Sequence, residues 1–278
     1  MARMARIKVK GEEAFYLVTS HTVWERQKAF SPEEKQKFIL LLLKLSKLYF
    51  VRILAYAVLD NHFHIVVKVL PGYLFSDEEI IERVRIFYGD RIKIFSNQQI
   101  QYWRSRLEDL SEFIKALKQR FTQWYNRKHK RKGHLWSDRF HSSLLQEGRA
   151  VLAAMAYVDM NGVRAGLAQR VRDYIWCSYY ARLIGAEWLA PVEECGESTI
   201  CSLLDYVDFV ETECDREKKN SERIFLGKIV HMSKGIILGS KPFVKDFLDH
   251  IRRKSYAKGF RQIEELPLKG LFSIKLRF

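Results

Sequence analysis

Runs of apolar residues predict three strands near the start of the chain. Residues 15–23 are rich in β-branched and aromatic side chains, as is typical of a strand. Residues 51–58 and 62–69 have the same character. The turn between them, at Asp60 and Asn61, predicts a hairpin.

Helical periodicity surrounds these strands and leads to a fourth. A Leu-rich segment from residue 32 to about 48 predicts one helix, and residues 110–128 predict an amphipathic helix with a basic outer face. A strand at about 139–145 and an Ala- and Met-rich helix at about 147–161 follow. This order suits an α+β protein with a split β-α-β fold, in which helices cover one face of an antiparallel sheet.

Two further segments depart from this pattern. Residues 73–108 carry mixed charges with few repeating apolar positions, so we interpret them as an insertion. Acidic residues dominate residues 187–217, which indicates a domain boundary. We therefore expect a first domain over residues 1–186. Residues 187–278 would form an acidic linker and a basic, mostly helical C-terminal module.

The charge balance indicates a nucleic-acid partner. The chain has 48 Lys and Arg residues against 33 Asp and Glu, a formal net charge of +15. Residues 115–132 contain no acid and interleave basic with aromatic side chains. Such a stretch can pair with phosphates and stack on bases, although a basic surface can also be merely solvated. The candidate DNA contacts are Lys118, Arg120, Arg127, Lys128, Lys130, Arg131, Lys132, Trp136 and Arg139. For Trp136 a core position is the alternative.

Nothing in the composition indicates a membrane or secreted protein. No apolar run reaches the roughly 18 residues of a membrane helix, and the basic N-terminus does not lead into an apolar signal core. None of the four cysteines forms a C-x-x-C pair. We therefore expect reduced thiols in a cytoplasmic protein.

Two histidines begin the predicted strand 62–69. Because alternate side chains of a strand share a face, Phe63 and Ile65 point to the core, while His62 and His64 point the other way. The two histidines are about 7 Å apart along the strand. Two imidazoles in adjacent same-face positions can bind one divalent cation. The alternative is a pair of histidines on a solvent-exposed face.

A tyrosine and an asparagine share one face of the last predicted helix. Tyr157 and Asn161 are one helical turn apart, and Arg164 lies about one turn further on. A tyrosine beside a metal ion can act as a nucleophile toward a phosphate, and an amide oxygen suits Mg²⁺ or Mn²⁺. Alternatively, Tyr157 is a satisfied interfacial residue and Asn161 a helix cap.

Three motifs in this order resemble a known family. The segment Tyr56–His64, YAVLDNHFH, is similar to the histidine–hydrophobe–histidine motif of the HUH endonucleases. The segments Gly133–Phe140, GHLWSDRF, and Tyr157–Gly166, YVDMNGVRAG, resemble those of the REP-associated tyrosine transposases, relatives of the single-tyrosine insertion-sequence transposases. The resemblance spans roughly residues 13–185, apart from the predicted insertion.

The resemblance implies a ferredoxin-like catalytic fold that uses Mg²⁺ or Mn²⁺. By resemblance, His62 and His64 are metal ligands, Tyr157 is the nucleophile, and Asn161 stands where relatives place a polar ligand on the helix. Insertion-sequence relatives commonly have Gln at this position, which leaves water, Glu147 or His141 open as the third ligand. Many REP-associated relatives follow the Asn with Pro, where this chain has Gly162.

These features together predict an enzyme that acts on single-stranded DNA. The family implies cleavage near hairpins formed by palindromic repeats, with strand transfer through a 5′-phosphotyrosine, and Arg164 joins the candidate DNA contacts. Family members act as monomers or as homodimers. The alternative is a regulatory protein that binds repeat DNA on the same fold without catalysis.

Overall fold

The chain forms an α+β fold around one mixed sheet. The computed structural model describes residues 7–24, 29–92, 96–219, 235–253, 260–265 and 270–276. Seven strands in these residues pair in the order β2-β3-β1-β4-β5-β7-β6. Their bounds are β1 Ala14–His21, β2 Val51–Val58, β3 His62–Val69, β4 His141–Leu145, β5 Gly235–Gly239, β6 Phe260–Glu265 and β7 Phe272–Leu276.

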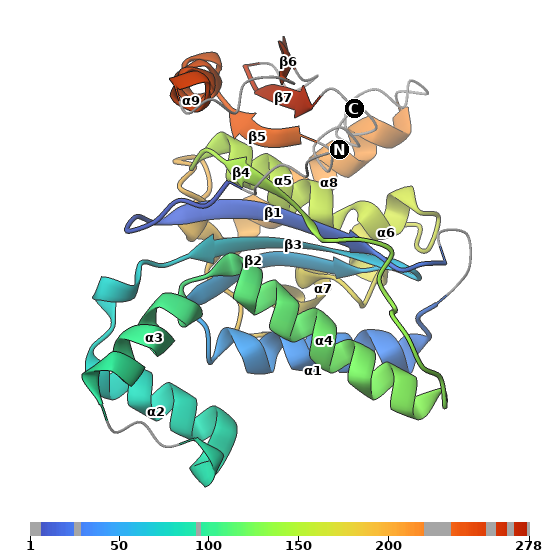
Figure 1. Cartoon of the computed structure of the whole chain (residues 1–278). Helices are drawn as coiled ribbons and strands as arrows, with labels where there is room; N and C mark the ends of the chain where they lie inside the picture. The colour runs from blue at the N-terminus through green and yellow to red at the C-terminus, as the bar shows by residue number, and fades with distance from the viewer. Residues whose placement is uncertain are drawn as a thin grey trace.

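Helices connect and cover the strands (Figure 1). The α-helices are α1 Pro32–Ser46, α2 Asp77–Tyr88, α3 Asn97–Leu107, α4 Leu110–Lys128, α5 Arg149–Asp159, α6 Asn161–Arg164, α7 Ser178–Leu183, α8 Leu203–Lys219 and α9 Lys241–Arg253. Short 3₁₀ helices are η1 Gly72–Leu74, η2 Gly89–Arg91, η3 Val171–Asp173 and η4 Val192–Cys195.

The first four strands confirm the predicted antiparallel arrangement. β3 pairs with β2 and β1, and β1 pairs with β4, all antiparallel. The chain order β1-α1-β2-β3-α4-β4 is that of a split β-α-β fold. At the predicted hairpin turn, the backbone N–H of Leu59 donates to the carbonyl oxygen of His62 at 2.9 Å.

One face of the sheet packs on α1 and α4, and there the predicted apolar set of β3 is buried. The ring of Phe63 from β3 lies 4.7 Å from that of Phe38 on α1, which in turn lies 5.3 Å from Phe121 on α4. Leu42 and Leu117 belong to the same cluster. The odd-numbered residues of β3 therefore face the core, as the alternation predicts.

The sequence predicted helices on one face of the sheet only. Besides α1 and α4 on that face, helices also cover the opposite face. The helix α5 packs against β2 and β3 on the side that carries His62 and His64. Leu17, Ala57 and Val66 make this second face apolar between the strand ends. Because the sheet is apolar on both faces, it needs a helix on each side to exclude water.

The predicted insertion consists of two capped helices. The side chain of Glu79 accepts from the backbone N–H of Ser76 at 2.8 Å at the start of α2, and Gln99 accepts from Ser96 at 3.2 Å at the start of α3. In Figure 1 these helices stand out at the lower left, away from β5, β6 and β7. Buried apolar residues, among them Trp103, join them to the α1–α4 side of the core.

The described C-terminal residues contain the helices α8 and α9, and also three strands that the expectation of a mostly helical module did not include. The strand β5 pairs in parallel with β4, and β7 and β6 continue the sheet. Without β5, the strand β4 would be an exposed edge, and the buried residues Ile237 and Leu238 cover it. The two segments therefore share one sheet, and a domain boundary near residue 187 stays a prediction.

Two smaller expectations concern cysteines and membranes. The four cysteines are free thiols, and three of them are buried. No helix in the described part of the chain is long and apolar enough to cross a membrane.

Candidate active site

Three histidines gather on the α5 side of the sheet, where the end of β1 pairs with the start of β3. The register sets His64 opposite Thr19 and His62 opposite His21. Directly paired residues of neighbouring strands share a face. The ring centroids of His21 and His62 are 4.6 Å apart, and those of His62 and His64 are 5.1 Å apart. The predicted pair is therefore part of a larger imidazole cluster.

A neighbouring amide determines which nitrogen of His62 is available. The Nδ1 atom of His62 lies 2.7 Å from Oδ1 of Asn61, whose Nδ2 atom donates to the carbonyl oxygen of Trp24. An amide oxygen only accepts, so Nδ1 of His62 carries the proton and Nε2 carries the lone pair. On His64, Nδ1 lies 3.0 Å from the hydroxyl of Thr19. Contacts of this kind orient imidazoles that bind metal ions.

Burial keeps these imidazoles neutral. The pKa of His62 is lowered to about 3, first because burial disfavours the imidazolium and then because His21 is close. Burial also holds the pKa of His64 well below its usual value, and His62, His21 and Arg164 lower it further. A histidine binds a metal ion through an unprotonated nitrogen. At neutral pH both side chains are therefore in the form that a ligand needs.

Tyr157 approaches the histidines from α5. Its ring lies edge-on to the ring of His64, with centroids 5.4 Å apart and planes at 89°. The guanidinium carbon of Arg164 lies 4.8 Å from the centroid of the Tyr157 ring. The structure thus brings together the predicted nucleophile, a predicted ligand and a predicted DNA contact. The tyrosine side chain is 4% exposed, so little of it is open to solvent.

Asn161, the first residue of α6, lies beside this group and directs its amide nitrogen back onto the end of α5. Its Nδ2 atom donates to the carbonyl oxygen of Tyr157 at 2.9 Å, and Arg164 donates to the same oxygen at 3.0 Å. The last carbonyls of a helix lack intrahelical donors, so these contacts cap the end of α5. The nitrogen of Asn161 has the capping role that was the alternative, and metal binding through its oxygen stays a prediction.

Gly162 packs against Tyr174, which leaves no room for a side chain at this position. A Cβ at Gly162 would lie 2.3 Å from Cγ of Tyr174. Tyr174 donates its hydroxyl to the carbonyl oxygen of Val58 at 2.7 Å and lies 3.4 Å from Nζ of Lys35. Lys35 in turn pairs with Asp60 in the hairpin turn at 2.6 Å. The Tyr174 side chain therefore joins the segment after α5 to the hairpin that carries the histidines.

Sequence reasoning missed His21, although a signal existed. Thr19 and His21 alternate on one face of the first strand, as His62 and His64 do on β3. The pairing of the two strands is what makes these rows neighbours, and no local pattern specifies that pairing.

The two protein alternatives for a third ligand lie in different places. His141 pairs with Thr19 across β1 and β4, so it lies on the same face as the histidine cluster. The side chain of Glu147 instead lies against Gly196, at less than 3 Å from the Cβ that an alanine would have there. The geometry therefore favours His141 over Glu147 as a neighbour of the site.

The donor set fits a two-histidine metal site. Within the described residues, no three His, Cys, Asp or Glu side chains form a group that could hold a metal ion. His62 and His64 supply neutral imidazoles in adjacent positions on one strand. A divalent ion held by two imidazoles keeps positions for water or phosphate oxygens. Such a site is suited to polarising a bound phosphate.

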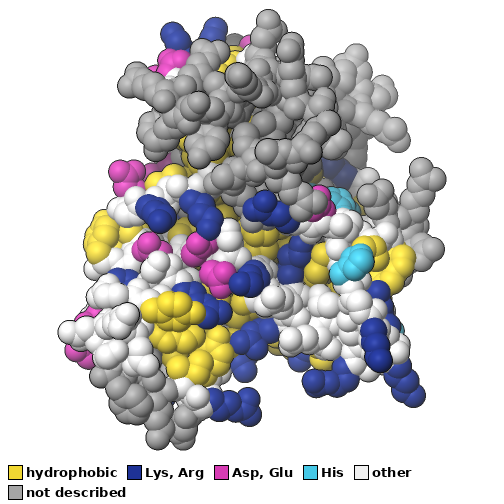
Figure 2. Space-filling view, viewed as in Figure 1, with side chains coloured by type: hydrophobic (Ala, Val, Ile, Leu, Met, Phe, Trp, Pro, Cys, Tyr) yellow, Lys and Arg dark blue, Asp and Glu magenta, His cyan; other side chains and the backbone are white. Residues whose placement is uncertain are grey.

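Most of the predicted DNA contacts lie on α4 and the loop after it. Figure 2 shows Lys and Arg side chains gathered at the lower right, over the end of α4. The exposed ones are Arg127, Lys128, Lys130, Lys132 and Arg139. Their accessibility is what a phosphate contact requires.

Three other predicted contacts are half-buried and have partners within the protein. Lys118 donates to the hydroxyl of Ser20 at 2.8 Å. The guanidinium carbon of Arg120 lies 4.9 Å from the ring centroid of Phe87 on α2. The guanidinium carbon of Arg131 lies 4.4 Å from the ring centroid of Trp24. These side chains position the basic surface as well as contributing charge to it.

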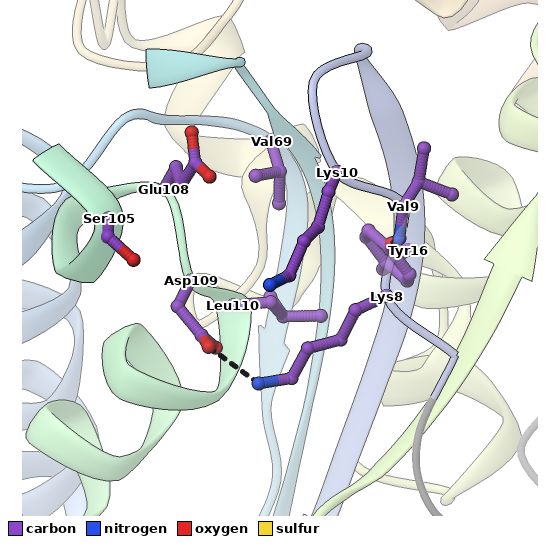
Figure 3. A pocket seen from close by; sticks show the side chains of 9 residues that line it. All are labelled: Lys8, Val9, Lys10, Tyr16, Val69, Ser105, Glu108, Asp109 and Leu110. Atoms are coloured by element: carbon purple, nitrogen blue, oxygen red, sulfur yellow. Dashed lines mark hydrogen bonds and ion pairs between the residues drawn. The ribbon is translucent and has the colours of Figure 1, made fainter.

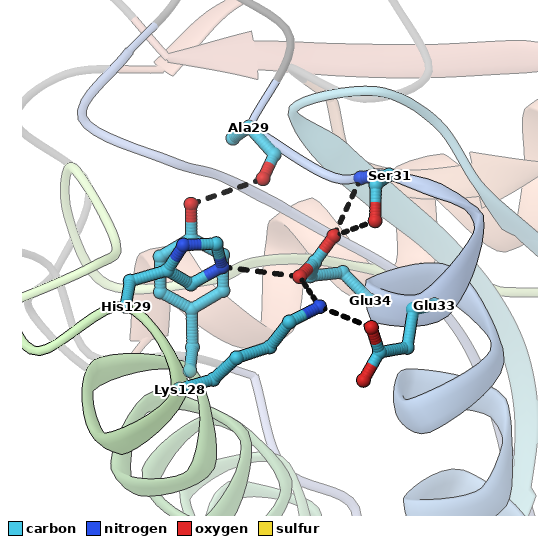
Figure 4. Close-up of polar contacts among 7 residues, drawn as sticks. Ala29, Ser31, Glu33, Glu34, Lys128 and His129 are labelled. Carbon is cyan, nitrogen blue, oxygen red and sulfur yellow. Dashed lines mark hydrogen bonds and ion pairs between the residues drawn. The ribbon is translucent and has the colours of Figure 1, made fainter.

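An ion-pair cluster anchors the basic end of α4 to the start of α1 (Figure 4). Glu34 is buried and accepts from Lys128, from His129 at 3.0 Å and from the backbone N–H of Ser31 at 2.8 Å. Burial alone would raise the pKa of Glu34, but the hydrogen bonds from Lys128, Ser31 and His129 outweigh it and lower the pKa to about 2. Lys128 is thus both a predicted DNA contact and a structural tie.

Trp136 is a core residue, which corrects its assignment as a DNA contact. It is 8% exposed, and its ring lies 5.4 Å from that of Phe63 and 6.0 Å from that of Phe30. Its Nε1–H donates to the hydroxyl of Thr122 at 3.0 Å. The indole therefore has no face open for stacking on a base, and the core alternative is the one observed.

A small cavity lies at the other end of β1 from the histidines (Figure 3). It is lined by Lys8, Tyr16, Val69 and Asp109, among others, and Lys8 forms an ion pair with Asp109 at 2.5 Å. The cavity has a volume of about 50 Å³ and holds no more than a few waters. It is too small for a nucleotide.

No protein-family model and no curated protein matches the chain. Among solved structures, it matches that of a REP-associated tyrosine transposase bound to a REP hairpin, with 16% sequence identity and a TM-score of 0.47. The match covers 69% of this chain and 93% of that chain. The matched structure is that of a member of the family whose motifs the sequence resembles. The proposed function rests on the side chains of the site.

Proposed function

We propose that this protein is a metal-dependent nuclease and strand transferase that cleaves single-stranded DNA near hairpin repeats. The observation that carries the proposal is the edge-on contact of Tyr157 with His64, at 5.4 Å between ring centroids. It sets a phenol next to two neutral imidazoles in a protein with a formal net charge of +15. This combination suits phosphoryl transfer to tyrosine.

His62 and His64 would hold a Mg²⁺ or Mn²⁺ ion, with Asn61 and Thr19 orienting their rings. The ion, when bound, would polarise the scissile phosphate and orient it for in-line attack. Asn161 remains the proposed third ligand, through its amide oxygen.

Tyr157 would attack the phosphate directly. A bond forms between its phenolic oxygen and the phosphorus, the bond from phosphorus to the 3′-oxygen breaks, and the phenol proton reaches the departing 3′-oxygen through water. The positive charge of Arg164, 4.8 Å from the ring, would stabilise the developing phenolate and the phosphate oxygens. The 5′-phosphotyrosine keeps the phosphodiester energy, so a DNA 3′-hydroxyl can reverse the step.

The DNA would lie along the basic surface of α4 and its loop. Exposed Arg127, Lys130 and Lys132 extend that surface beyond the helix. The choice of a hairpin repeat as substrate rests on the resemblance of the motifs Gly133–Phe140 and Tyr157–Gly166 to REP-associated transposases. The net charge of +15 supports a polyanionic partner.

A 3′-end-labelled single strand with a hairpin repeat, incubated with the protein and Mn²⁺, tests this proposal on a denaturing protein gel. We expect label to migrate with the wild-type protein, and to be lost with Tyr157→Phe or with a chelator. Tyr73→Phe is the control, because Tyr73 is 71% exposed on the insertion. Adduct formation by Tyr157→Phe, or by chelated wild-type protein, would refute the assignment.

The burial of Tyr157 favours a second candidate, a protein that binds repeat DNA without cleaving it. A side chain only 4% exposed must gain access to the DNA before it can attack. Under this alternative the same labelled hairpins bind tightly but give no adduct, and Tyr157→Phe binds as the wild type does.

A further inference from the structure

A buried carboxylate ties α5 to two later helices. Asp159 is the last residue of α5 and is 0% exposed. Its Oδ1 atom accepts from the hydroxyl of Ser178 at 2.5 Å and from the backbone N–H of Tyr179 at 2.9 Å. Its Oδ2 atom accepts from the hydroxyl of Tyr206 at 2.6 Å. Ser178 and Tyr179 begin α7, and Tyr206 lies in α8, so one side chain joins three helices.

The same network reaches the strand next to the histidines. The hydroxyl oxygen of Ser178 accepts from the backbone N–H of Tyr56 on β2 at 2.9 Å. The residue before it, Cys177, forms an isolated bridge with Ala57. Ala57 lies opposite His64 in the pairing of β2 with β3. The carboxylate therefore fixes the end of α5 relative to the strand that neighbours His64.

The buried Asp159 carboxyl group restricts the orientation of α5. Burying a carboxyl group costs free energy, which its hydrogen bonds must offset. Hydrogen bonds differ from apolar contacts because they fix direction as well as distance. Three donors aimed at Asp159 restrict rotation and sliding of α5. Tyr157 lies two residues earlier on the same helix, so a shift of Asp159 shifts the phenol.

We propose that Asp159 and Tyr206 are positioning residues that set the phenol of Tyr157 against His64. The helix α8, which lies outside the split β-α-β core, is then a functional part of the site. This inference rests on the proposed role of Tyr157 as nucleophile. Its geometric part, the dependence of the Tyr157 position on the Tyr206 hydroxyl, can be tested without any reaction.

The test variant is Tyr206→Phe, which removes one hydroxyl and keeps the ring. Tyr179→Phe is the matched control, because the Tyr179 hydroxyl donates to a different carboxylate, that of Glu211 at 2.7 Å, and the variant keeps the backbone N–H that donates to Asp159. Each variant loses one phenol–carboxylate hydrogen bond. Ser178→Ala is the second test variant if Tyr206→Phe does not fold.

Three quantities are measured on the full chain. The first is the ¹⁹F chemical shift of 3-fluorotyrosine placed at position 157 in DNA-free protein. The second is the rate of adduct formation in a single turnover with a labelled hairpin and Mn²⁺. The third is the Kd for that hairpin. The Phe variants keep their rings, so a changed shift reports movement of residue 157 and not a lost ring current.

We expect Tyr206→Phe to change the ¹⁹F shift and to slow adduct formation by about tenfold or more, because small misplacements of a nucleophile cost large factors in rate. Its Kd should stay within about twofold of wild type, and Tyr179→Phe should change neither shift nor rate. An unchanged shift in Tyr206→Phe would overturn the inference, as would equal effects in both variants. If the wild type forms no adduct, the proposed chemistry fails, while the shift still decides whether Tyr206 positions residue 157.

Discussion

His64 and Tyr157 contact each other edge to face across the space between β3 and α5, with ring centroids 5.4 Å apart. The histidine comes from a hairpin strand and the tyrosine from a helix that follows the fourth strand. Their contact depends on α5 packing on the sheet face opposite α1 and α4. The contact is therefore formed within one chain.

The Thr19 hydroxyl should increase metal affinity although it does not touch the ion. Thr19→Val removes the partner of His64 Nδ1 while keeping the side-chain shape, and we expect Mn²⁺ affinity to fall about tenfold. Thr19→Ser keeps the hydroxyl and should bind nearly as the wild type does. Calorimetric titration with Mn²⁺ measures both. Equal affinities for the valine and serine variants would show that the hydroxyl does not orient His64.

Metal binding should resist acid more than an ordinary histidine site does. Protons compete with the metal only near the folded pKa, and burial, then His21, lower that of His62 to about 3. A histidine with a pKa of about 6.5 would lose about tenfold in affinity between pH 7.5 and pH 5.5. We expect the Mn²⁺ affinity to change less than about twofold over that range. Calorimetric titration measures the affinity, and circular dichroism checks that the protein stays folded. A tenfold loss would mean that the imidazoles titrate normally.

Gly162→Ala should destabilise the fold through Tyr174. The added Cβ would lie 2.3 Å from the Tyr174 ring, and we expect the free energy of unfolding to fall by about 2 kcal/mol in urea denaturation. In a Tyr174→Ala background, the same substitution should cost less than about 1 kcal/mol, because the clash is gone. Equal costs in both backgrounds would locate the strain elsewhere.

Glu34 should make stability depend on pH in the acid range. Its folded pKa is about 2 against 4.5 for a free side chain, because hydrogen bonds from Lys128, Ser31 and His129 outweigh the effect of burial. Between these values the unfolded chain binds more protons, so this stabilisation is present above about pH 4.5 and is lost as the pH falls toward 2.

Glu34→Gln removes that contribution. We expect it to lower the free energy of unfolding by about 2 kcal/mol at pH 7, and the difference from wild type to shrink as the pH falls below 4.5. Chemical denaturation at pH 7, 5 and 3.5 measures the difference. A difference that is constant over this range would assign the stabilisation to packing and not to charge.

Local periodicity made several elements predictable. The strands Val51–Val58 and His62–Val69 and the helix Leu110–Lys128 have the predicted bounds, because side-chain alternation and helical spacing are properties of a short segment. The same alternation separated the histidines of β3 from its apolar residues. The role of Trp136 was harder to predict, because an indole beside a strand can pack in the core or stack on a base. Its contact with Phe63 shows that it packs in the core.

By itself, the sequence determined the split β-α-β order, the common face of His62 and His64, and the charge that indicates a nucleic-acid partner. It predicted one helix through Tyr157 and Asn161, whereas α5 ends at Asp159 and α6 begins at Asn161. Tertiary structure alone decided that His21 joins the histidines, that α5 covers them, and that β5 extends the sheet. The physical reason is the separation along the chain of the residues that interact. Spacing within a segment fixes which side chains share a face, whereas strand register and helix docking depend on apolar surfaces far apart in the chain that must be buried together.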